Sequence, residues 1–152
     1  MAAGNTQNAR KRPRVLVAGT SDAIEALVKA LHGAADVVAA ESVKEALAEL
    51  DARPFDTIAC NVRFDESRMF EFLQAVMDRK LPDLRIVAFR AEDAALSHST
   101  RSAIKNALEA LGVERFVDLS QLRAEYGHDV AMEALRKIVL DGSFTPPAPA
   151  GQ

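Results

Sequence analysis

Apolar residues alternate between two patterns along the central part of the chain. Five short runs rich in apolar residues predict buried strands, and each run is followed by apolar residues spaced three and four positions apart, as on one face of a helix. We expect the strands at 15–18, 36–40, 57–62, 84–89 and 115–117. The helical repeats fall within 24–31, 43–50, 69–76, 104–111 and 130–139. Alternating strands and helices are typical of a parallel sheet with helices on both faces.

Cap and turn residues support several of these boundaries. A hydroxyl at Thr20, or at the serine after it, can cap the first helix, and Ser42 with Glu45 forms the pattern of a capping box. Gly112 is placed to end the fourth helix. The segment 118–127 fits either a short extra turn or an early start of the last helix.

Five strand–helix units predict a doubly wound α/β fold of the flavodoxin-like type. This fold is a (βα)5 three-layer sandwich, and we expect its five-stranded parallel sheet to have the order 2-1-3-4-5. The domain is predicted to span 14–142. Because 1–13 is polar and 143–152 is rich in proline, both ends are predicted to be disordered tails.

Composition and charge narrow the functional classes. The chain has 152 residues, of which 49% are hydrophobic and 27% charged, as in one soluble domain. A formal net charge of -3 argues against binding to nucleic acid or to an anionic membrane, and no apolar run approaches the ~18 residues of a membrane span. Cys60 is the only cysteine, which excludes an intramolecular disulfide and favours a cytoplasmic location.

The third predicted strand ends in an amide side chain, that of Asn61. Open α/β sheets place their functional groups at the carboxyl ends of the strands, so Asn61 is expected at the functional edge. A neutral amide is a far weaker nucleophile than a carboxylate and does not form an acyl phosphate. Asn61 is therefore not expected to accept a phosphoryl group.

The pattern resembles the receiver domain of bacterial two-component response regulators, which has the chemotaxis-regulator-like fold. The resemblance covers roughly 14–142 and rests on the spacing of the elements and on three segments. These are Phe55-Asp56 before the third strand, 86–91 at the fourth and 112–117 at the fifth.

The resemblance also implies that every functional position of the family is changed. The phosphate-accepting aspartate corresponds to Asn61, and the acidic pair that helps to bind magnesium corresponds to Gly19 and Thr20. The hydroxyl residue that ends the fourth strand corresponds to Arg90, and the lysine after the fifth strand corresponds to Leu119. The chain therefore resembles a degenerate receiver, or pseudo-receiver, with no catalytic residue, no metal site and no cofactor.

Charged residues near this edge leave two questions open. Arg90 is expected either to face the crevice, where its guanidinium can bond to Asn61 or pair with Asp118 and hold one conformation, or to lie exposed on the surface. The acids at 22, 65, 66 and 118 are also expected around the edge. One interpretation is that these acids together bind a cation weakly. The alternative is that the acids at 22, 65 and 66 only solvate loops and interact favourably with the positive end of a helix dipole.

The resemblance further implies a partner-binding face formed by the fourth helix, the fifth strand and the fifth helix. Here this face includes Arg101, Lys105, Glu109 and Phe116. Phe116 occupies the position of the family's switch aromatic, and the alternative is a strand aromatic that stays buried.

Two functions of different classes follow. The first is a phosphorylation-independent protein-binding module in bacterial signal transduction or regulation, whose partner is a signalling kinase, another regulator or a second copy of the chain. The alternative is a domain that binds a small anionic ligand or nucleotide at the carboxyl edge, where the turn 19–21 can present backbone amides. Hydrolysis is disfavoured, because the neighbours Ser97, His98 and Ser99 do not make a triad.

Overall fold

A five-stranded parallel sheet forms the centre of the protein, and the computed structural model describes residues 12–145. The strands are β1 (Arg14–Ala18), β2 (Asp36–Ala40), β3 (Thr57–Asn61), β4 (Arg85–Arg90) and β5 (Arg115–Asp118). They lie in the order β2-β1-β3-β4-β5, which confirms the predicted topology. In the register of the edge strand, Phe116 lies beside Ala88 and Asp118 beside Arg90.

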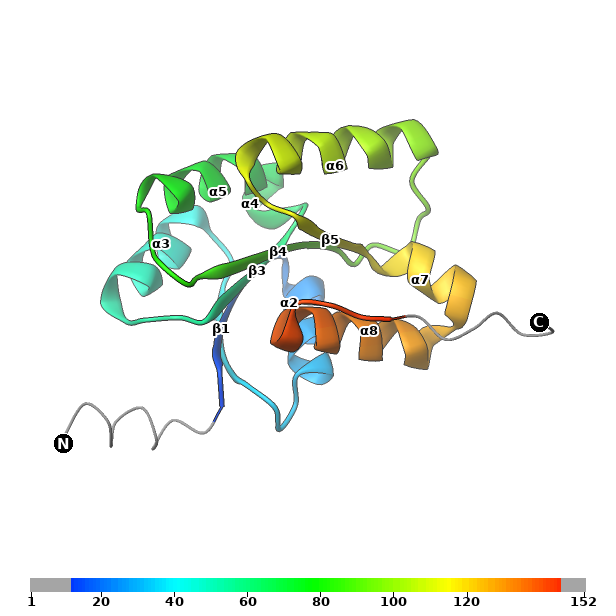
Figure 1. Ribbon diagram of the computed structural model, residues 1–152, viewed down its shortest axis with the longest axis horizontal. Helices are drawn as coiled ribbons and strands as arrows, with labels where there is room; N and C mark the ends of the chain where they lie inside the picture. Colours follow the sequence, from blue (N-terminus) through cyan, green and yellow to red (C-terminus); the bar gives the residue numbers. More distant parts are fainter. Residues whose placement is uncertain (1–11, 146–152) are drawn as a thin grey trace.

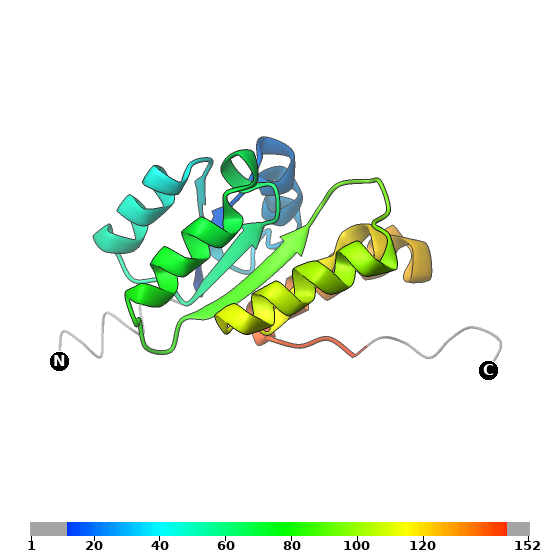
Figure 2. The same cartoon turned by 90° about the horizontal axis from the view of Figure 1, so that it is seen from above.

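Helices cover both faces of this sheet (Figure 1). One face carries α2 (Ser21–Ala30) and α8 (His128–Asp141). The other carries α3 (Val43–Ala52), α5 (Met69–Asp78) and α6 (His98–Leu111), which lie side by side across the sheet in Figure 2. Two shorter segments, α4 (Phe64–Ser67) and α7 (Leu119–Tyr126), follow the carboxyl ends of β3 and β5.

The continuous apolar runs of the strands follow from this layering. Successive strand side chains point to opposite faces, and both faces are covered, so nearly every strand position needs an apolar residue. On β3, for example, Ile58 packs in the cluster beneath α3, α5 and α6, whereas Ala59 packs in the cluster against α2 and α8.

Local side-chain bonds place the helix ends where the sequence predicts them. The Thr20 hydroxyl accepts a hydrogen bond from the Ala23 amide at 3.3 Å, and the Ser42 hydroxyl accepts one from the Glu45 amide at 3.1 Å. Gly112 ends α6 with a φ of 100°, a conformation that glycine adopts without steric cost.

The structure departs from five simple strand–helix units in two places. The segment 118–127 is neither a short turn nor an early start of the last helix, because α7 is an eight-residue helix separate from α8. After β3, Asp65 and Glu66 have φ values of 48° and 56°, so the chain makes a left-handed turn before α5 begins at Met69. Residues 12–145 therefore hold seven helical segments.

The predicted tails, 1–13 and 143–152, fall largely outside the described residues. Between residues 12 and 145, none of the helices has the length and hydropathy that crossing a bilayer requires.

Candidate functional site

The carboxyl ends of the strands surround a crevice with a cavity of about 520 Å³. It is lined by the start of α2, by Arg63 after β3, and by residues 91–93 after β4. The lining includes three acidic residues, Asp22, Glu92 and Asp93, and one basic residue, Arg63. The crevice therefore carries a net negative charge from its lining side chains.

Asn61, the last residue of β3, is completely buried, and its side-chain amide both donates and accepts a hydrogen bond. The Nδ2 group donates a hydrogen bond to the carbonyl of Phe89 at 3.3 Å, and Oδ1 accepts one from the Arg63 amide at 3.0 Å. A carboxylate at this position would turn an oxygen, instead of a donor, toward the Phe89 carbonyl. The local geometry thus favours an amide over a carboxylate at this position.

Gly19 is the closest neighbour of Asn61 from the first strand–helix turn. A Cβ atom on Gly19 would lie 3.0 Å from the Asn61 Cβ and 3.2 Å from the Ala23 Cβ. Such separations are tight, so a side chain on Gly19 would require Asn61 or Ala23 to shift, and the adjacent Thr20 uses its hydroxyl to cap α2. Neither Gly19 nor Thr20 carries a carboxylate that could bind a metal ion.

Arg90 is buried, with 6% of its surface exposed, so the exposed alternative is wrong. Its Nη1 atom lies 3.4 Å from Oδ1 of Asp118, its partner in the neighbouring strand. The same guanidinium donates to the carbonyls of Glu92 and Ala94, and its Nε lies 3.7 Å from the Glu92 carboxylate. Of the two contacts that the sequence suggests, the structure contains the one with Asp118.

Asp118 joins two arginines from different elements. Its second oxygen, Oδ2, lies 3.2 Å from Nε of Arg101, which comes from the first turn of α6. The Asp118 side chain is 2% exposed, and it also caps α7 by accepting from the amide of Ser120 at 3.1 Å. This group of Arg90, Asp118 and the partly exposed Arg101, hereafter the Asp118 cluster, connects β4, β5, α6 and α7.

The remaining predicted site residues lie apart from one another. Arg101, expected on the outer face, has its guanidinium in the Asp118 cluster, where its side chain is 23% exposed. Lys105 and Glu109 are exposed on α6, and Phe116 is half-buried against the core cluster beneath α6. Leu119 is completely buried against α2 and α8, so no cation reaches the crevice from that position.

The acidic residues around the edge do not gather into one site. The Asp65 carboxylate accepts from the Val43 amide at 2.8 Å and lies 3.2 Å from Nη1 of Arg68, while Asp118 is held by its two arginines. Within residues 12–145, no group of three or more histidine, cysteine or acidic side chains has the geometry of a metal site.

Burial also determines the chemistry of Cys60, the residue before Asn61. It is fully buried, and removal from water raises the pKa of its thiol well above the usual range. Because the thiolate is the reactive form, this arrangement favours an inert, packed cysteine.

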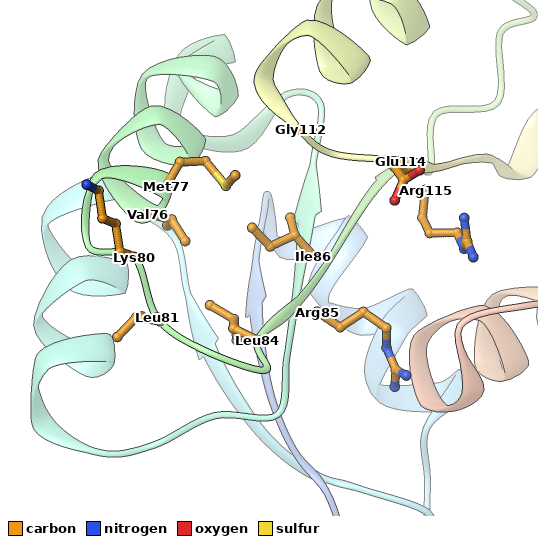
Figure 3. A pocket seen from close by; sticks show the side chains of 10 residues that line it. All are labelled: Val76, Met77, Lys80, Leu81, Leu84, Arg85, Ile86, Gly112, Glu114 and Arg115. Carbon is orange, nitrogen blue, oxygen red and sulfur yellow. The ribbon is translucent and has the colours of Figure 1, made fainter.

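A second cavity, of about 370 Å³, lies at the opposite edge of the sheet between the ends of α5 and α6 (Figure 3). Apolar side chains line much of it, among them Met77, Leu84 and Ile86, while the guanidinium groups of Arg85 and Arg115 turn away toward the end of α8. Arg85 donates to the Val139 carbonyl at 2.9 Å, and Arg115 donates to the Gly142 carbonyl. This cavity is not part of the crevice around Asn61.

Comparison with solved structures shows which proteins share this fold. The chemotaxis response regulator CheY4 of Vibrio cholerae gives a TM-score of 0.60 at 20% sequence identity, covering 85% of this chain and 100% of that one. A response regulator from Thermotoga maritima gives a TM-score of 0.60 at 19% sequence identity, and the match covers 84% of this chain and 97% of that one. No protein-family model matches the chain, and comparison with curated proteins gives no significant match. The protein therefore has the fold of response-regulator receiver domains.

Proposed function

We propose that this protein is a receiver-like module that acts without phosphorylation, by binding another protein in bacterial signal transduction. The observation that carries the proposal is the Asp118 cluster, in which a buried carboxylate holds one arginine from the sheet and one from α6. In this proposal the protein is not an enzyme, and the cytoplasm is its compartment.

The first support is that the polar side chains at the carboxyl ends of β3, β4 and β5 find their hydrogen-bond and ion-pair partners within the protein. Both ends of the Asn61 amide are hydrogen-bonded, and a side chain on Gly19 would crowd Asn61 and Ala23. Arg90 and Arg101 find their counter-charge in Asp118 rather than in a phosphoryl group. Buried ion pairs of this kind serve best to fix one arrangement, because breaking them leaves an uncompensated charge.

The second support is the link between the crevice and α6. Arg101 ties the first turn of α6 to the end of β5, and Leu108 is the one residue of this helix that is buried. Most of α6 therefore presents side chains to solvent, including Lys105 and Glu109. We propose that this surface of α6, with Phe116 beside it, binds a signalling kinase or another regulator.

A small anionic ligand or nucleotide in the crevice is the alternative function. The cavity beside the start of α2 favours it, since helix amino termini attract anions. The carboxylates of Asp22, Glu92 and Asp93 oppose it, because they repel a phosphate that approaches the same space.

The test is affinity capture from an extract of the native cell, with bound proteins identified by mass spectrometry. The wild type is compared with a Lys105→Glu, Ala107→Arg variant, which alters two exposed positions of α6. A Lys44→Glu, Ala48→Arg variant makes the same two changes on the exposed side of α3 and is the matched control.

We expect a protein that the wild type and the α3 variant retain and the α6 variant loses. Equal retention by all three would refute α6 as the binding surface. The absence of any specific partner, combined with thermal stabilisation of the wild type by a nucleotide, would favour the ligand-binding alternative, because a ligand of the native state raises the melting temperature.

A further inference from the structure

The cavity between the ends of α5 and α6 combines an apolar wall with charged residues at its rim (Figure 3). Its volume of about 370 Å³ falls within the roughly 300–1,000 Å³ of small-molecule pockets. It lies at the amino end of β4, at the opposite edge of the sheet from Asn61. The proposed function assigns no role to this cavity.

The apolar wall of the cavity is accessible to solvent. It is formed by side chains of α5, of β4 and of the loop between them, namely Val76, Met77, Leu81, Leu84 and Ile86. Leu81 is 41% exposed, and Met77, Leu84 and Ile86 are half-buried. A ligand gains free energy from covering such surface roughly in proportion to the apolar area that it removes from water. An apolar body is therefore the first requirement for a ligand of this cavity.

Lys80 stands at the α5 side of the cavity in a backbone conformation that is uncommon for lysine. It is the second residue after α5, and its φ is 50°, a left-handed conformation that glycine adopts at lower steric cost. The negative end of the helix dipole favours a cation at this place. In the described part of the chain, however, its ammonium group has no carboxylate partner. Lys80 is therefore available to pair with an anionic group of a ligand.

Glu114 supplies the opposite charge at the other side of the cavity. It precedes β5, and Figure 3 shows Met77 and Ile86 between it and Lys80. Glu114 is exposed, and among residues 12–145 it too has no ion-pair partner. Its carboxylate is therefore available to pair with a cationic group.

The two arginines of the lining already have partners within the protein. Arg85 donates to the Val139 carbonyl at 2.9 Å, and Arg115 donates to the Gly142 carbonyl. These carbonyls lie at the end of α8, where the negative end of the helix dipole stabilises both guanidinium groups. The available charges of the cavity are thus one cation and one anion, on opposite sides of an apolar wall.

We propose that this cavity binds an elongated apolar molecule with a carboxylate at one end and an ammonium group at the other. Aminoalkanoates and short apolar peptides belong to this class. The carboxylate pairs with Lys80 and the ammonium group with Glu114, while the apolar body lies against the wall that includes Met77 and Ile86. A molecule with two like charges satisfies only one of the rim residues and is repelled by the other. The rim charges therefore select the ligand and fix its direction in the cavity.

Nuclear magnetic resonance titrations of the full chain test this proposal with three compounds of equal length, which are aminooctanoate, suberate and diaminooctane. In the wild type, we expect aminooctanoate to bind tightest and to shift the amide signals of Met77, Ile86 and Gly112. Exposed ion pairs contribute little free energy each, so the preference over either of the other compounds is expected to be roughly two- to fivefold.

Two charge reversals at exposed positions should exchange this preference. Lys80→Glu leaves carboxylates on both sides and should favour diaminooctane, whereas Glu114→Lys leaves ammonium groups on both sides and should favour suberate. The variant that combines both changes should prefer aminooctanoate again, bound in the reverse direction. Lys137→Glu, at an exposed position of α8, is the matched control and should keep the wild-type order of affinities. The amide spectrum of each variant verifies its fold.

Two results would overturn the proposal. One is a wild-type chain in which aminooctanoate causes no saturable shift of the cavity signals. The other is the same order of affinity for the three compounds in all variants, because the rim charges would then have no part in recognition. Neither result depends on the partner that α6 binds, so this proposal and the proposed function can fail independently.

Discussion

Asp118 and Arg101 connect the edge strand β5 to helix α6 through a 3.2 Å ion pair. The same carboxylate lies 3.4 Å from Arg90 in the neighbouring strand, so one buried anion neutralises two cations. A displacement of α6 would expose or unpair these charges. The position of α6 is therefore coupled to the end of the sheet by electrostatics as well as by packing.

Replacing Asp118 with asparagine tests how much the Asp118 cluster contributes to the stability of the fold. Asparagine keeps the size and the capping ability of the side chain, but it removes the buried carboxylate that Arg90 and Arg101 share and leaves Arg90 only the Glu92 carboxylate at 3.7 Å. We expect the free energy of unfolding to fall by about 3 kcal/mol in urea denaturation. The control is Asp93→Asn, which removes a fully exposed carboxylate and is expected to change the free energy of unfolding by less than about 0.5 kcal/mol. Similar losses in the two variants would contradict the assigned importance of Asp118.

Leu119→Lys restores the cation that the resembled family has at this position, and we expect it to destabilise the fold. The Leu119 side chain is completely buried against α2 and α8, where an ammonium group finds no water. The expected cost is at least about 3 kcal/mol. Leu119→Met preserves the volume and should cost less than about 1.5 kcal/mol. A lysine variant as stable as the methionine variant would show that the side chain can reach the crevice.

Much of the fold could be predicted because the sheet is covered on both sides. Strands such as β1 then consist almost entirely of apolar residues, and their helices repeat apolar residues at helical spacing. The separate helix α7 could not be assigned, because 118–127 has few apolar residues to define a period, and its start depends on the Asp118 cap.

At the site, the sequence predicts which positions are substituted but not the contacts that their side chains make. The bonds of Asn61 depend on where the Phe89 carbonyl and the Arg63 amide meet in space. The resemblance to receiver domains places Arg101 on the partner-binding face, yet Arg101 continues the inner stripe of Ile104 and Leu108 at helical spacing. That spacing was the available signal for its inward orientation.

Cys60 is expected to resist alkylation in the folded protein. Burial raises the pKa of its thiol, so the thiolate fraction stays low even where a free thiol, with a pKa near about 8.5, begins to ionise. Labelling with iodoacetamide followed by mass spectrometry should therefore be slow between neutral and mildly alkaline pH, and fast in urea. Native labelling that rises with pH as steeply as in urea would indicate an accessible thiol.

Asn61→Asp alone should not create a phosphorylation site. The new carboxylate would face the Phe89 carbonyl, which now accepts from the amide at 3.3 Å, and Gly19 supplies no second carboxylate for a metal ion. We expect a loss of about 1–3 kcal/mol in stability and no saturable change in amide spectra when magnesium and beryllofluoride are added. An active receiver domain in the same buffer provides the positive control. A saturable shift in the variant would reveal a residual metal site, and one in the wild type would overturn the assignment of Asn61 to the acceptor position.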